Sequence, residues 1–230
     1  MSLVLVTGAS RGIGRAIAAR FAGEGCKVIG CAREGEALRT LCAQLPQVEA
    51  VACDMRDDAA VDAFAGELLE RHGVPDLLVN NAGQYRPGRI SEEDDGALLD
   101  MLQANLFGAY RLTRRMLPGM VARRSGTILN MCSIASIGAY PDGGSYSIAK
   151  HALHGFSRNL REEMKPHGVR VVALLPGATL TSSWDGVDLP PERFMPAEDV
   201  AEMAWSAWRM SQRTVVEDIV MRPQLGDLGT

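Results

Sequence analysis

The sequence contains no apolar run that approaches the ~18 residues a membrane helix needs. A strand is expected from Leu3 onward, which leaves no room before it for a charged segment, an apolar stretch and a cleavage site. The five cysteines are odd in number, scattered and without a CxxC pair, so a disulfide framework or a zinc site is disfavoured. We therefore expect no membrane partner, no metal site and a cytoplasmic, reducing location.

The sequence also lacks a strong charge of either sign. The formal net charge is -4, which gives no reason to expect a nucleic acid or an anionic membrane as partner. With 230 residues, 47% hydrophobic and 23% charged, the chain is long enough to bury a core and is not disordered by composition. No linker, repeat or low-complexity tract interrupts it, so one domain is expected over residues 1–230.

Short apolar runs alternate with longer amphipathic segments. Runs that are apolar throughout indicate strands buried on both faces of a parallel sheet. The expected architecture is α/β: a doubly wound (Rossmann) parallel sheet of about seven strands with helices on both faces. Strands are predicted at 3–7, 27–31, 48–53, 76–80, 126–131, 169–175 and 217–221. Helices are predicted at 12–24, 34–44, 59–71, 97–123 (interrupted at Pro118–Gly119), 145–165 and 197–209.

Three glycines follow the first strand, in the stretch from Thr7 to Gly14. Gly8 allows a tight turn, and Gly12 and Gly14 allow the backbone to approach a phosphate and a helix to approach a strand. The N-terminus of the next helix offers unpaired N–H groups and a positive dipole end to a pyrophosphate. A plain glycine-rich turn is the alternative, but the position between a strand and a helix favours a dinucleotide site.

The end of the second strand bears on the choice of nucleotide. An NAD site places an acidic residue there to accept hydrogen bonds from the ribose, but this chain has Ala32, followed by Arg33. Arg33 and Arg11 are suited to a 2′-phosphate through charge-assisted hydrogen bonds. NADP(H) is therefore preferred over NAD(H), although Glu34 is a nearby acid and either arginine could be a solvated surface charge.

A second set of residues points to proton transfer. Tyr146 and Lys150 lie four apart on a predicted helix and therefore share one face. A nearby ammonium lowers the pKa of a tyrosine hydroxyl, which is about 10 when unperturbed. Tyr146 is thus a candidate general acid and base for a carbonyl and its alcohol, and Ser133 a candidate to hydrogen-bond the substrate oxygen. The Tyr–Lys spacing alone occurs by chance on many helices.

Together these segments resemble the short-chain dehydrogenase/reductase family, in particular its NADP-dependent carbonyl and 3-oxoacyl reductases. The resemblance rests on T-G-x-x-x-G-x-G from Thr7, N-N-A-G from Asn80, the Asn105–Ser133–Tyr146–Lys150 order and P-G-x-x-x-T from Pro176. It runs from Leu3 to about Thr181. The family's glycine-rich last strand is absent, which weakens any transfer of its tetramer interface.

The resemblance implies roles for individual residues. Asn105, Ser133, Tyr146 and Lys150 are expected to be catalytic, with Asn105 binding a water that passes protons to Lys150, and Lys150 holding the nicotinamide ribose. Asp54 is expected at the adenine, although it could instead cap the next helix, as could Asp57. The expected cofactor contacts are Gly8, Ser10, Arg11, Gly12, Ile13, Gly14, Arg33, Asp54, Met55, Asn81, Ala82, Gly83, Tyr146, Lys150, Pro176, Gly177, Thr179 and Thr181.

The resemblance also places a short substrate lid at residues 182–195. Its apolar cover is predicted to include Trp184, Leu189, Phe194 and Met195, with Tyr85, Ile134, Ile137 and Tyr140 on the opposite wall. These residues favour a small or flat apolar ketone. By the same analogy, a homodimer or homotetramer is expected, with dimers formed through helices 97–123 and 145–165.

Two other functions stay open. One is a non-catalytic NADPH-binding sensor or scaffold, although relatives of that kind usually lack the tyrosine or the lysine. The other is a sugar-nucleotide epimerase or dehydratase, which needs a larger C-terminal domain.

Three groups of charged residues are predicted to have no part in chemistry. Glu92–Asp95 is expected to complement the dipole of the helix that follows it. His151 and His154 are expected at the surface or an interface. The arginines of helix 97–123 are expected to form a solvated or interfacial face; they are Arg111, Arg114, Arg115, Arg123 and Arg124.

Overall fold

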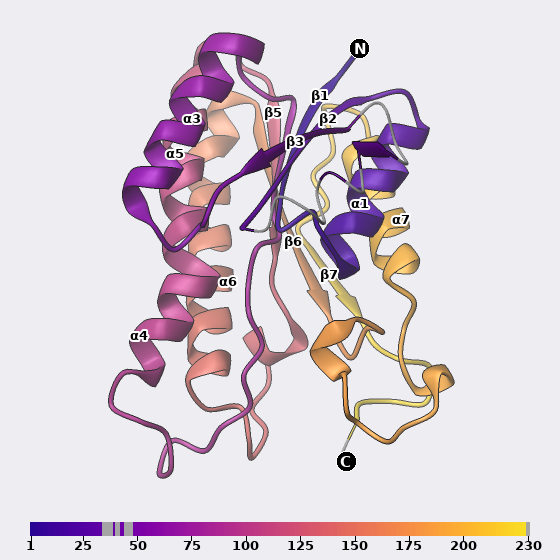
Figure 1. The fold of residues 1–230 in the computed structure, drawn as a ribbon. Coiled ribbons are helices and arrows are strands. Elements are labelled where there is room, and N and C mark those ends of the chain that lie inside the picture. Colours follow the sequence, from indigo (N-terminus) through magenta and orange to yellow (C-terminus); the bar gives the residue numbers. More distant parts are fainter. Residues whose placement is uncertain (34–38, 40–41, 44–47, 229–230) are drawn as a thin grey trace.

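A computed structural model describes residues 1–33, 39, 42–43 and 48–228, and shows a parallel sheet between two layers of helices (Figure 1). The sheet has seven strands in the order β3-β2-β1-β4-β5-β6-β7. These are β1 (Leu3–Thr7), β2 (Lys27–Ala32), β3 (Val48–Ala52), β4 (Leu77–Asn80), β5 (Gly126–Met131), β6 (Val169–Pro176) and β7 (Asp218–Met221). The predicted α/β sheet is confirmed, and the helix predicted at 34–44 falls largely outside the described residues.

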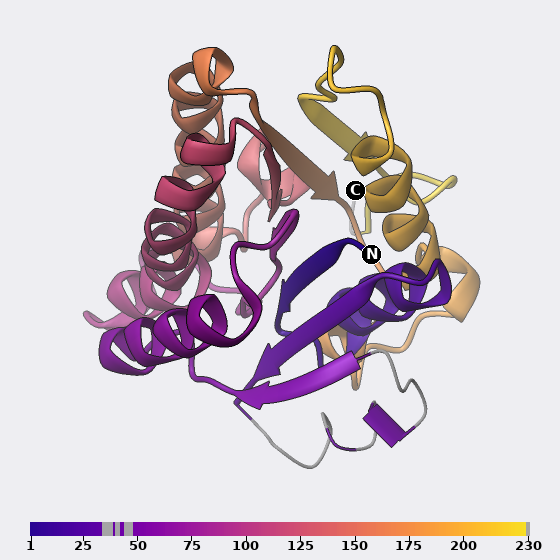
Figure 2. The ribbon, with the colours of Figure 1, turned by 90° about the horizontal axis from the view of Figure 1, so that it is seen from above.

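The helices cover both faces of this sheet (Figure 2). On one side lie α1 (Gly12–Gly23) and α7 (Ala197–Trp208), where the buried Phe21 ring meets Trp205 and Trp208 edge to face at 5.2 and 5.5 Å. On the other lie α3 (Asp58–His72), α4 (Ala97–Leu102), α5 (Gly108–Arg123) and α6 (Gly144–Met164). Strands β1, β5 and β6 are buried at every position because both of their faces are covered.

The long helix between β4 and β5 is interrupted, but not where the sequence suggested. A π-helical turn at Gln103–Phe107 separates α4 from α5, and the helix continues through Pro118. Asn105 Nδ2 donates to the Met101 carbonyl at 3.0 Å, a carbonyl that an α-helix would pair with the Asn105 N–H. Gly119 lets α5 pack closely against Val74, since a Cβ at position 119 would lie 2.1 Å from Val74 Cγ2. The prediction of a break at Pro118–Gly119 was therefore wrong.

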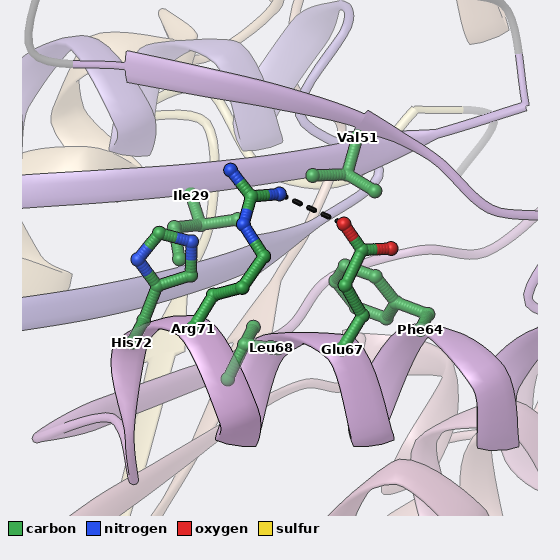
Figure 3. Close-up of a pocket in the computed structure, with 7 residues that line it drawn as sticks. All are labelled: Ile29, Val51, Phe64, Glu67, Leu68, Arg71 and His72. Carbon is green, nitrogen blue, oxygen red and sulfur yellow. Dashed lines mark hydrogen bonds and ion pairs between the residues drawn. The ribbon is translucent and has the colours of Figure 1, made fainter.

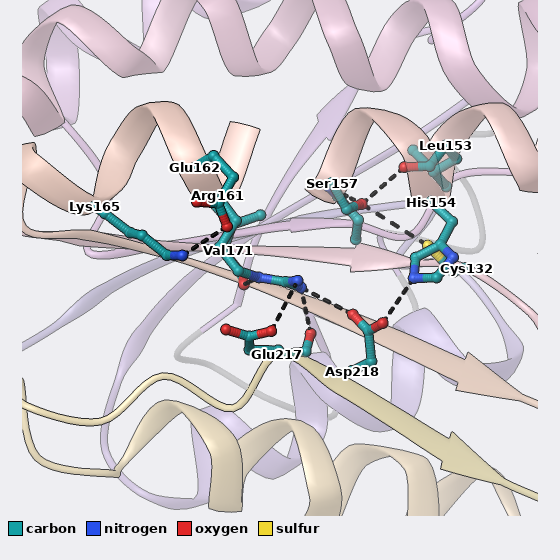
Figure 4. Close-up of polar contacts among 11 residues, drawn as sticks. Cys132, Leu153, His154, Ser157, Arg161, Glu162, Lys165, Val171, Glu217 and Asp218 are labelled. Atoms are coloured by element: carbon teal, nitrogen blue, oxygen red, sulfur yellow. Dashed lines mark hydrogen bonds and ion pairs between the residues drawn. The ribbon is translucent and has the colours of Figure 1, made fainter. Parts of the chain in front are cut away.

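A polar cluster, with His154 and Arg161 buried and Asp218 at the surface, joins α6 to β7 (Figure 4). The Arg161 guanidinium donates to Asp218 Oδ1 at 2.9 Å and to the Val171 carbonyl at 2.9 Å. His154 Nε2 lies 2.9 Å from Asp218 Oδ2, and its residue is only 6% exposed. The expectation that His154 is a surface or interface residue was wrong, because β7 covers it, while His151 is exposed.

Part of the arginine row on α5 holds α5 to the rest of the chain. Arg111 and Arg115 both bind the Asp62 carboxylate on α3, through guanidinium nitrogens 2.7–2.9 Å from its oxygens. Arg123 donates to the carbonyls of Val74 and Pro75. The expectation of a wholly solvated or interfacial face is corrected for these three residues.

Candidate active site

The glycine turn after β1 is built by tertiary contacts as much as by glycine itself. Gly8 has φ +67°, and a Cβ there would lie 2.9 Å from Ala82 Cα. The Asn81 side-chain amide donates to the carbonyls of Thr7 and Gly8, and the Thr7 hydroxyl accepts from the N–H groups of Asn81 and Ala82. Because parallel strands end at one edge of the sheet, the turns after β1 and β4 lie together there.

This edge fits a dinucleotide phosphate. A Cβ at Gly14 would lie 2.2 Å from the Gly8 carbonyl oxygen, so only glycine lets α1 begin this close to β1. No described side chain caps the first turn of α1, and that turn has no acidic residue. Ser10 and Ile13 are half-buried on the same turn, and a Cβ at Gly12 would meet the Thr181 side chain. The residues present therefore offer amide donors and space to an anion.

Four residues predicted to contact the nucleotide lie on the loops after β1, β2 and β3. Arg11 and Arg33 are exposed, and Met55 is buried. Asp54 accepts hydrogen bonds from the guanidinium and N–H of Arg56, and these contacts, with Arg33 nearby, hold the pKa of Asp54 below its usual range. Asp54 does not cap α3.

That cap is Asp57, whose carboxylate accepts from the N–H groups of Ala59 and Ala60 at 2.9 and 3.1 Å. Asp54 is therefore not the N-cap of α3, which was its alternative role. The Asp54 side chain lies near Arg33 and Arg56 instead.

Ser133 and Tyr146 meet beyond the carboxyl end of β5. The Ser133 hydroxyl lies near enough to Tyr146 to favour its ionised form, and Ser133 Oγ accepts from the Ala135 N–H at 3.1 Å. Ser136, a second serine at this strand end, binds the Ser133 N–H with its hydroxyl at 3.1 Å. Of the two serines, Ser133 is thus the one that faces Tyr146, and Ser136 holds the turn that carries it.

Lys150 and Asn105 complete the predicted set. Lys150 Nζ lies 5.8 Å from the centre of the Tyr146 ring and donates to the Met131 carbonyl at 2.8 Å. The Asn105 amide pairs with the backbone of Gln84, accepting from its N–H and donating to its carbonyl. A Cβ at Gly83 would lie 2.7 Å from Asn105 Oδ1 and 3.6 Å from Lys150 Nζ, so the strand end after β4 passes between them.

Burial sets the proton affinities of this group. It raises the pKa of the Tyr146 hydroxyl to about 12, although the nearby Ser133 hydroxyl acts in the opposite direction. It lowers the pKa of Lys150 to about 8, an effect that the nearby Cys132 thiol opposes. Without a bound ligand the tyrosine is therefore protonated at neutral pH, and the lysine is largely protonated and becomes neutral above about pH 8.

The loop after β6 lies against both parts of the site. The Pro176 carbonyl accepts from the Ser133 hydroxyl at 3.5 Å, and Gly177 donates to the Met221 carbonyl at 2.8 Å. Thr179 is buried and donates to the Gly177 carbonyl, and Thr181 caps a short 3₁₀ turn at Ser182–Trp184. Leu180 and Ala178 then pair with Met195, which brings the two ends of segment 182–195 together.

Part of the predicted apolar cover forms a chain of rings. Tyr85 meets Tyr146 edge to face with ring centres 5.0 Å apart, Trp184 lies 5.6 Å from Tyr85, and Phe194 lies 5.4 Å from Trp184. Phe194 and Met195 are buried, whereas Leu189, Ile137 and Tyr140 are largely exposed.

Sequence reasoning missed Glu93. It was expected to complement the helix that follows, but its carboxylate accepts from the Ser145 N–H at 2.9 Å and from the Ser145 hydroxyl at 2.5 Å, at the first turn of α6. Of the four acidic residues 92–95 it alone is not exposed. The charge pattern of residues 92–95 could not predict that Glu93 binds Ser145, which is 52 residues away in the sequence.

A small pocket is lined by residues that were not predicted to belong to the site. This pocket, between β2, β3 and α3, is lined by Ile29, Val51, Phe64, Glu67, Leu68, Arg71 and His72 (Figure 3). It has room for about 10 Å³, roughly one water molecule. In the described part of the chain, no three His, Cys, Asp or Glu side chains are grouped to hold a metal ion, and no helix is both long and apolar enough to span a bilayer.

Known proteins share this arrangement. Residues 2–189 match the short chain dehydrogenase family. The chain belongs to this family. It is 34% identical to a Streptomyces coelicolor protein named for ketoacyl reductase activity, over 97% of this chain and 83% of that protein, and 32% identical to the sepiapterin reductase of Chlorobaculum tepidum, over 98% of both. The crystal structure of a tryptophan variant of actinorhodin polyketide ketoreductase with NADPH has 30% identity and a TM-score of 0.89, covering 98% of this chain and 97% of that one.

Membership makes the chain an oxidoreductase of the short-chain dehydrogenase class with a small-molecule substrate. The resemblance inferred from the sequence is therefore confirmed at the level of family and of enzyme class.

Proposed function

We propose that this short-chain dehydrogenase transfers a hydride between NADP(H) and a small carbonyl or secondary alcohol, with Tyr146 as general acid and base. One observation carries the proposal: Ser133, Tyr146 and Lys150 converge at the sheet edge that also bears the glycine turn. A proton donor and an anion site at one edge are what carbonyl reduction by a bound dinucleotide requires.

Each side chain has a defined task in reduction. A bound nicotinamide supplies the hydride. Ser133 donates a hydrogen bond to the substrate oxygen and stabilises its developing charge. Tyr146 gives that oxygen its proton, and the Lys150 ammonium, 5.8 Å from the Tyr146 ring centre, stabilises the phenolate left behind. Lys150 also holds the nicotinamide ribose, and Asn105 binds a water that returns protons to Lys150. In oxidation, Tyr146 removes the proton instead.

The proposed dinucleotide contacts follow the same edge. The turn from Gly8 to Gly14 would hold the pyrophosphate, Asp54 and Met55 the adenine, and Pro176–Thr181 the nicotinamide. Arg11 and Arg33 bind the 2′-phosphate and so select NADPH, because Ala32 stands where an NAD enzyme needs an acid. The related ketoreductase structure that contains NADPH supports this choice.

The sensor or scaffold is the weaker proposal on the same grounds. A sensor or scaffold needs no aligned Ser–Tyr–Lys group, and this chain has one. We further propose a cytoplasmic protein of one domain that assembles as a homodimer or homotetramer through α4–α5 and α6.

The test is NADPH consumption at neutral pH with a panel of β-ketoacyl thioesters, diketones, quinones, aldehydes and small cyclic ketones. Tyr146→Phe is expected to lower kcat by about 10²–10⁴-fold, because the proton donor is lost, while NADPH binding is retained. Tight NADPH binding with no turnover of any panel member by the wild type would favour the sensor.

A further inference from the structure

Aromatic side chains are scarce in this chain and are concentrated beside the reacting hydroxyls. Only 12 of the 230 residues are Phe, Trp or Tyr. Four of them form one continuous row of ring contacts that runs from Tyr146 through Tyr85 and Trp184 to Phe194. The Tyr140 hydroxyl lies near that of Tyr85, at the side of this row. A single catalytic tyrosine does not require such a row.

The segment that carries Tyr85 is fastened to the start of α6 and to the loop just before it. The Gly88 N–H donates to the Asp142 carbonyl at 3.0 Å, and the Arg89 guanidinium binds the Asp142 carboxylate at 3.0 Å. Further along, Glu93 holds Ser145, the residue next to Tyr146. Tyr85 is thereby held against the helix that bears the proton donor, in a chain segment without a helix or strand of its own.

Trp184 is fastened from the other side. Its ring rests on Phe194, which is only 7% exposed. The short 3₁₀ turn at Ser182–Trp184 is capped by Thr181, and the Leu180 and Ala178 pairings with Met195 close the segment at its base. The two rings therefore come from separate loops that are each held in place, and they meet at a tilt of 34°.

Tyr85 and Trp184 are half-buried, so part of each ring is open to a bound molecule. A carbonyl that accepts hydrogen bonds from Ser133 and Tyr146 brings its substituent to the Tyr85 ring, which is 5.0 Å from Tyr146 between centres. Aromatic pairs prefer centre distances of about 4.5–7 Å in stacked or edge-to-face geometry. A flat ring satisfies this preference, whereas a puckered ring of equal size does not.

On the basis of the proposed function, we infer that Tyr85 and Trp184 are specificity-determining residues that select carbonyl substrates carrying a flat aromatic ring. The Tyr85 ring is the main contact, because it lies between Tyr146 and Trp184. Trp184 extends the same surface toward the segment 182–195.

The experiment compares two ketones of equal carbon skeleton, 1-phenylpropan-2-one and 1-cyclohexylpropan-2-one. Their carbonyl groups are not conjugated to the ring, so intrinsic reactivity is similar. The quantity measured is the ratio of kcat/KM for the phenyl over the cyclohexyl ketone with NADPH. The wild type is expected to give a ratio of roughly tenfold, which is what one to two favourable ring contacts provide.

Matched variants separate the ring from its surroundings. Tyr85→Leu and Trp184→Leu are expected to bring the ratio close to one, whereas Tyr85→Phe keeps the ring and therefore the ratio. Ile90→Ala, on the same segment and 73% exposed, is expected to change nothing. Because a ratio is compared, a variant that only lowers total activity does not imitate the effect.

A wild-type ratio near one, turnover restricted to aliphatic panel members, or equal losses for both ketones in Tyr85→Leu would overturn the inference while leaving carbonyl reduction intact. Absence of NADPH oxidation with every carbonyl would instead overturn the proposed function, and this inference with it.

Discussion

The Glu93 carboxylate binds both the backbone N–H and the hydroxyl of Ser145, one residue before the proposed proton donor Tyr146. Gly88 and Gly144 leave space for this contact, since a Cβ on either would lie within 2.7 Å of Glu93 Oε1. An acidic side chain from a loop thus performs the capping that the sequence around the start of α6 does not supply, because no local side chain caps it.

Glu93→Gln is expected to lower kcat by roughly tenfold, because a weakened cap displaces Tyr146 by less than the ~1 Å that costs about 10²-fold at a reacting group. The affinity for NADPH, which binds elsewhere on the edge, is expected to stay constant. Steady-state kinetics and a binding titration measure the two quantities. Asp95→Asn, from the same acidic run but exposed, is the control. Equal changes in kcat and NADPH affinity would indicate a general loss of structure.

The lowered pKa of Lys150 predicts a pH limit for the enzyme. Below pH 8 its ammonium is charged and able to bind the ribose and stabilise the phenolate; above about 8 it is neutral. The kcat/KM for NADPH reports the free enzyme. It is expected to be level below pH 8 and to fall about tenfold per pH unit above it. A level profile up to pH 10 would contradict this reading of Lys150.

The choice of nucleotide is tested at Arg33 and Arg11. Replacing either by alanine is expected to raise the Kd of NADPH by roughly tenfold or more, because a charge-assisted hydrogen bond is worth about 1.5–3 kcal/mol. The Kd of NADH, which lacks the 2′-phosphate, should not change. Arg213→Ala, an exposed arginine near β7, is the control. If the Kd values of NADPH and NADH rise equally, these arginines do not bind the 2′-phosphate.

The cluster in Figure 4 makes a prediction about stability. Burial alone would raise the pKa of Asp218, but hydrogen bonds from His154 and Arg161 hold it below its ordinary value. Asp218 is itself about a third exposed, so solvent screens part of this contribution. Asp218→Asn is therefore expected to cost about 1 kcal/mol at neutral pH, or a Tm lower by about 2–4 °C. Because the carboxylate stabilises the fold only when ionised, the difference from wild type should close as the pH falls through this depressed pKa.

Thermal unfolding at several pH values measures this difference. Asp188→Asn, an exposed acid in segment 182–195, provides the comparison. A difference between wild type and Asp218→Asn that persists unchanged at acid pH would mean that the charge of Asp218 does not stabilise the tie between α6 and β7.

The pattern of apolar and polar residues along the chain was sufficient to predict the strands of the sheet and the motifs at their carboxyl ends. Strands β1 and β6 are apolar or buried throughout, so their runs of Val and Leu predicted them directly. The motifs that follow β1, β4 and β5 reach one edge because parallel strands end together. Ser133 and Tyr146 entered one predicted group through the resemblance to the family, because Tyr146 lies on α6 and not at a strand end.

What the sequence did not predict depends on contacts between distant segments. The partner of Glu93 is 52 residues away, and that of His154 is 64 residues away on the last strand. At the π turn, the Asn105 side-chain amide donates to the carbonyls of both Met101 and Gln84. No local residue pattern predicts these two hydrogen bonds. Charge and periodicity describe one segment at a time and cannot identify such pairs.

Transfer of deuterium from NADPH labelled at C4 of the nicotinamide tests the central claim most directly. With a carbonyl from the panel, the product alcohol is expected to carry deuterium at its carbinol carbon, and Tyr146→Phe is expected to form this product at least about 10²-fold more slowly. If labelled NADPH binds tightly but no carbonyl acquires deuterium from either stereochemical label, the chain is not a reductase, and the Ser133–Tyr146–Lys150 group must serve another purpose.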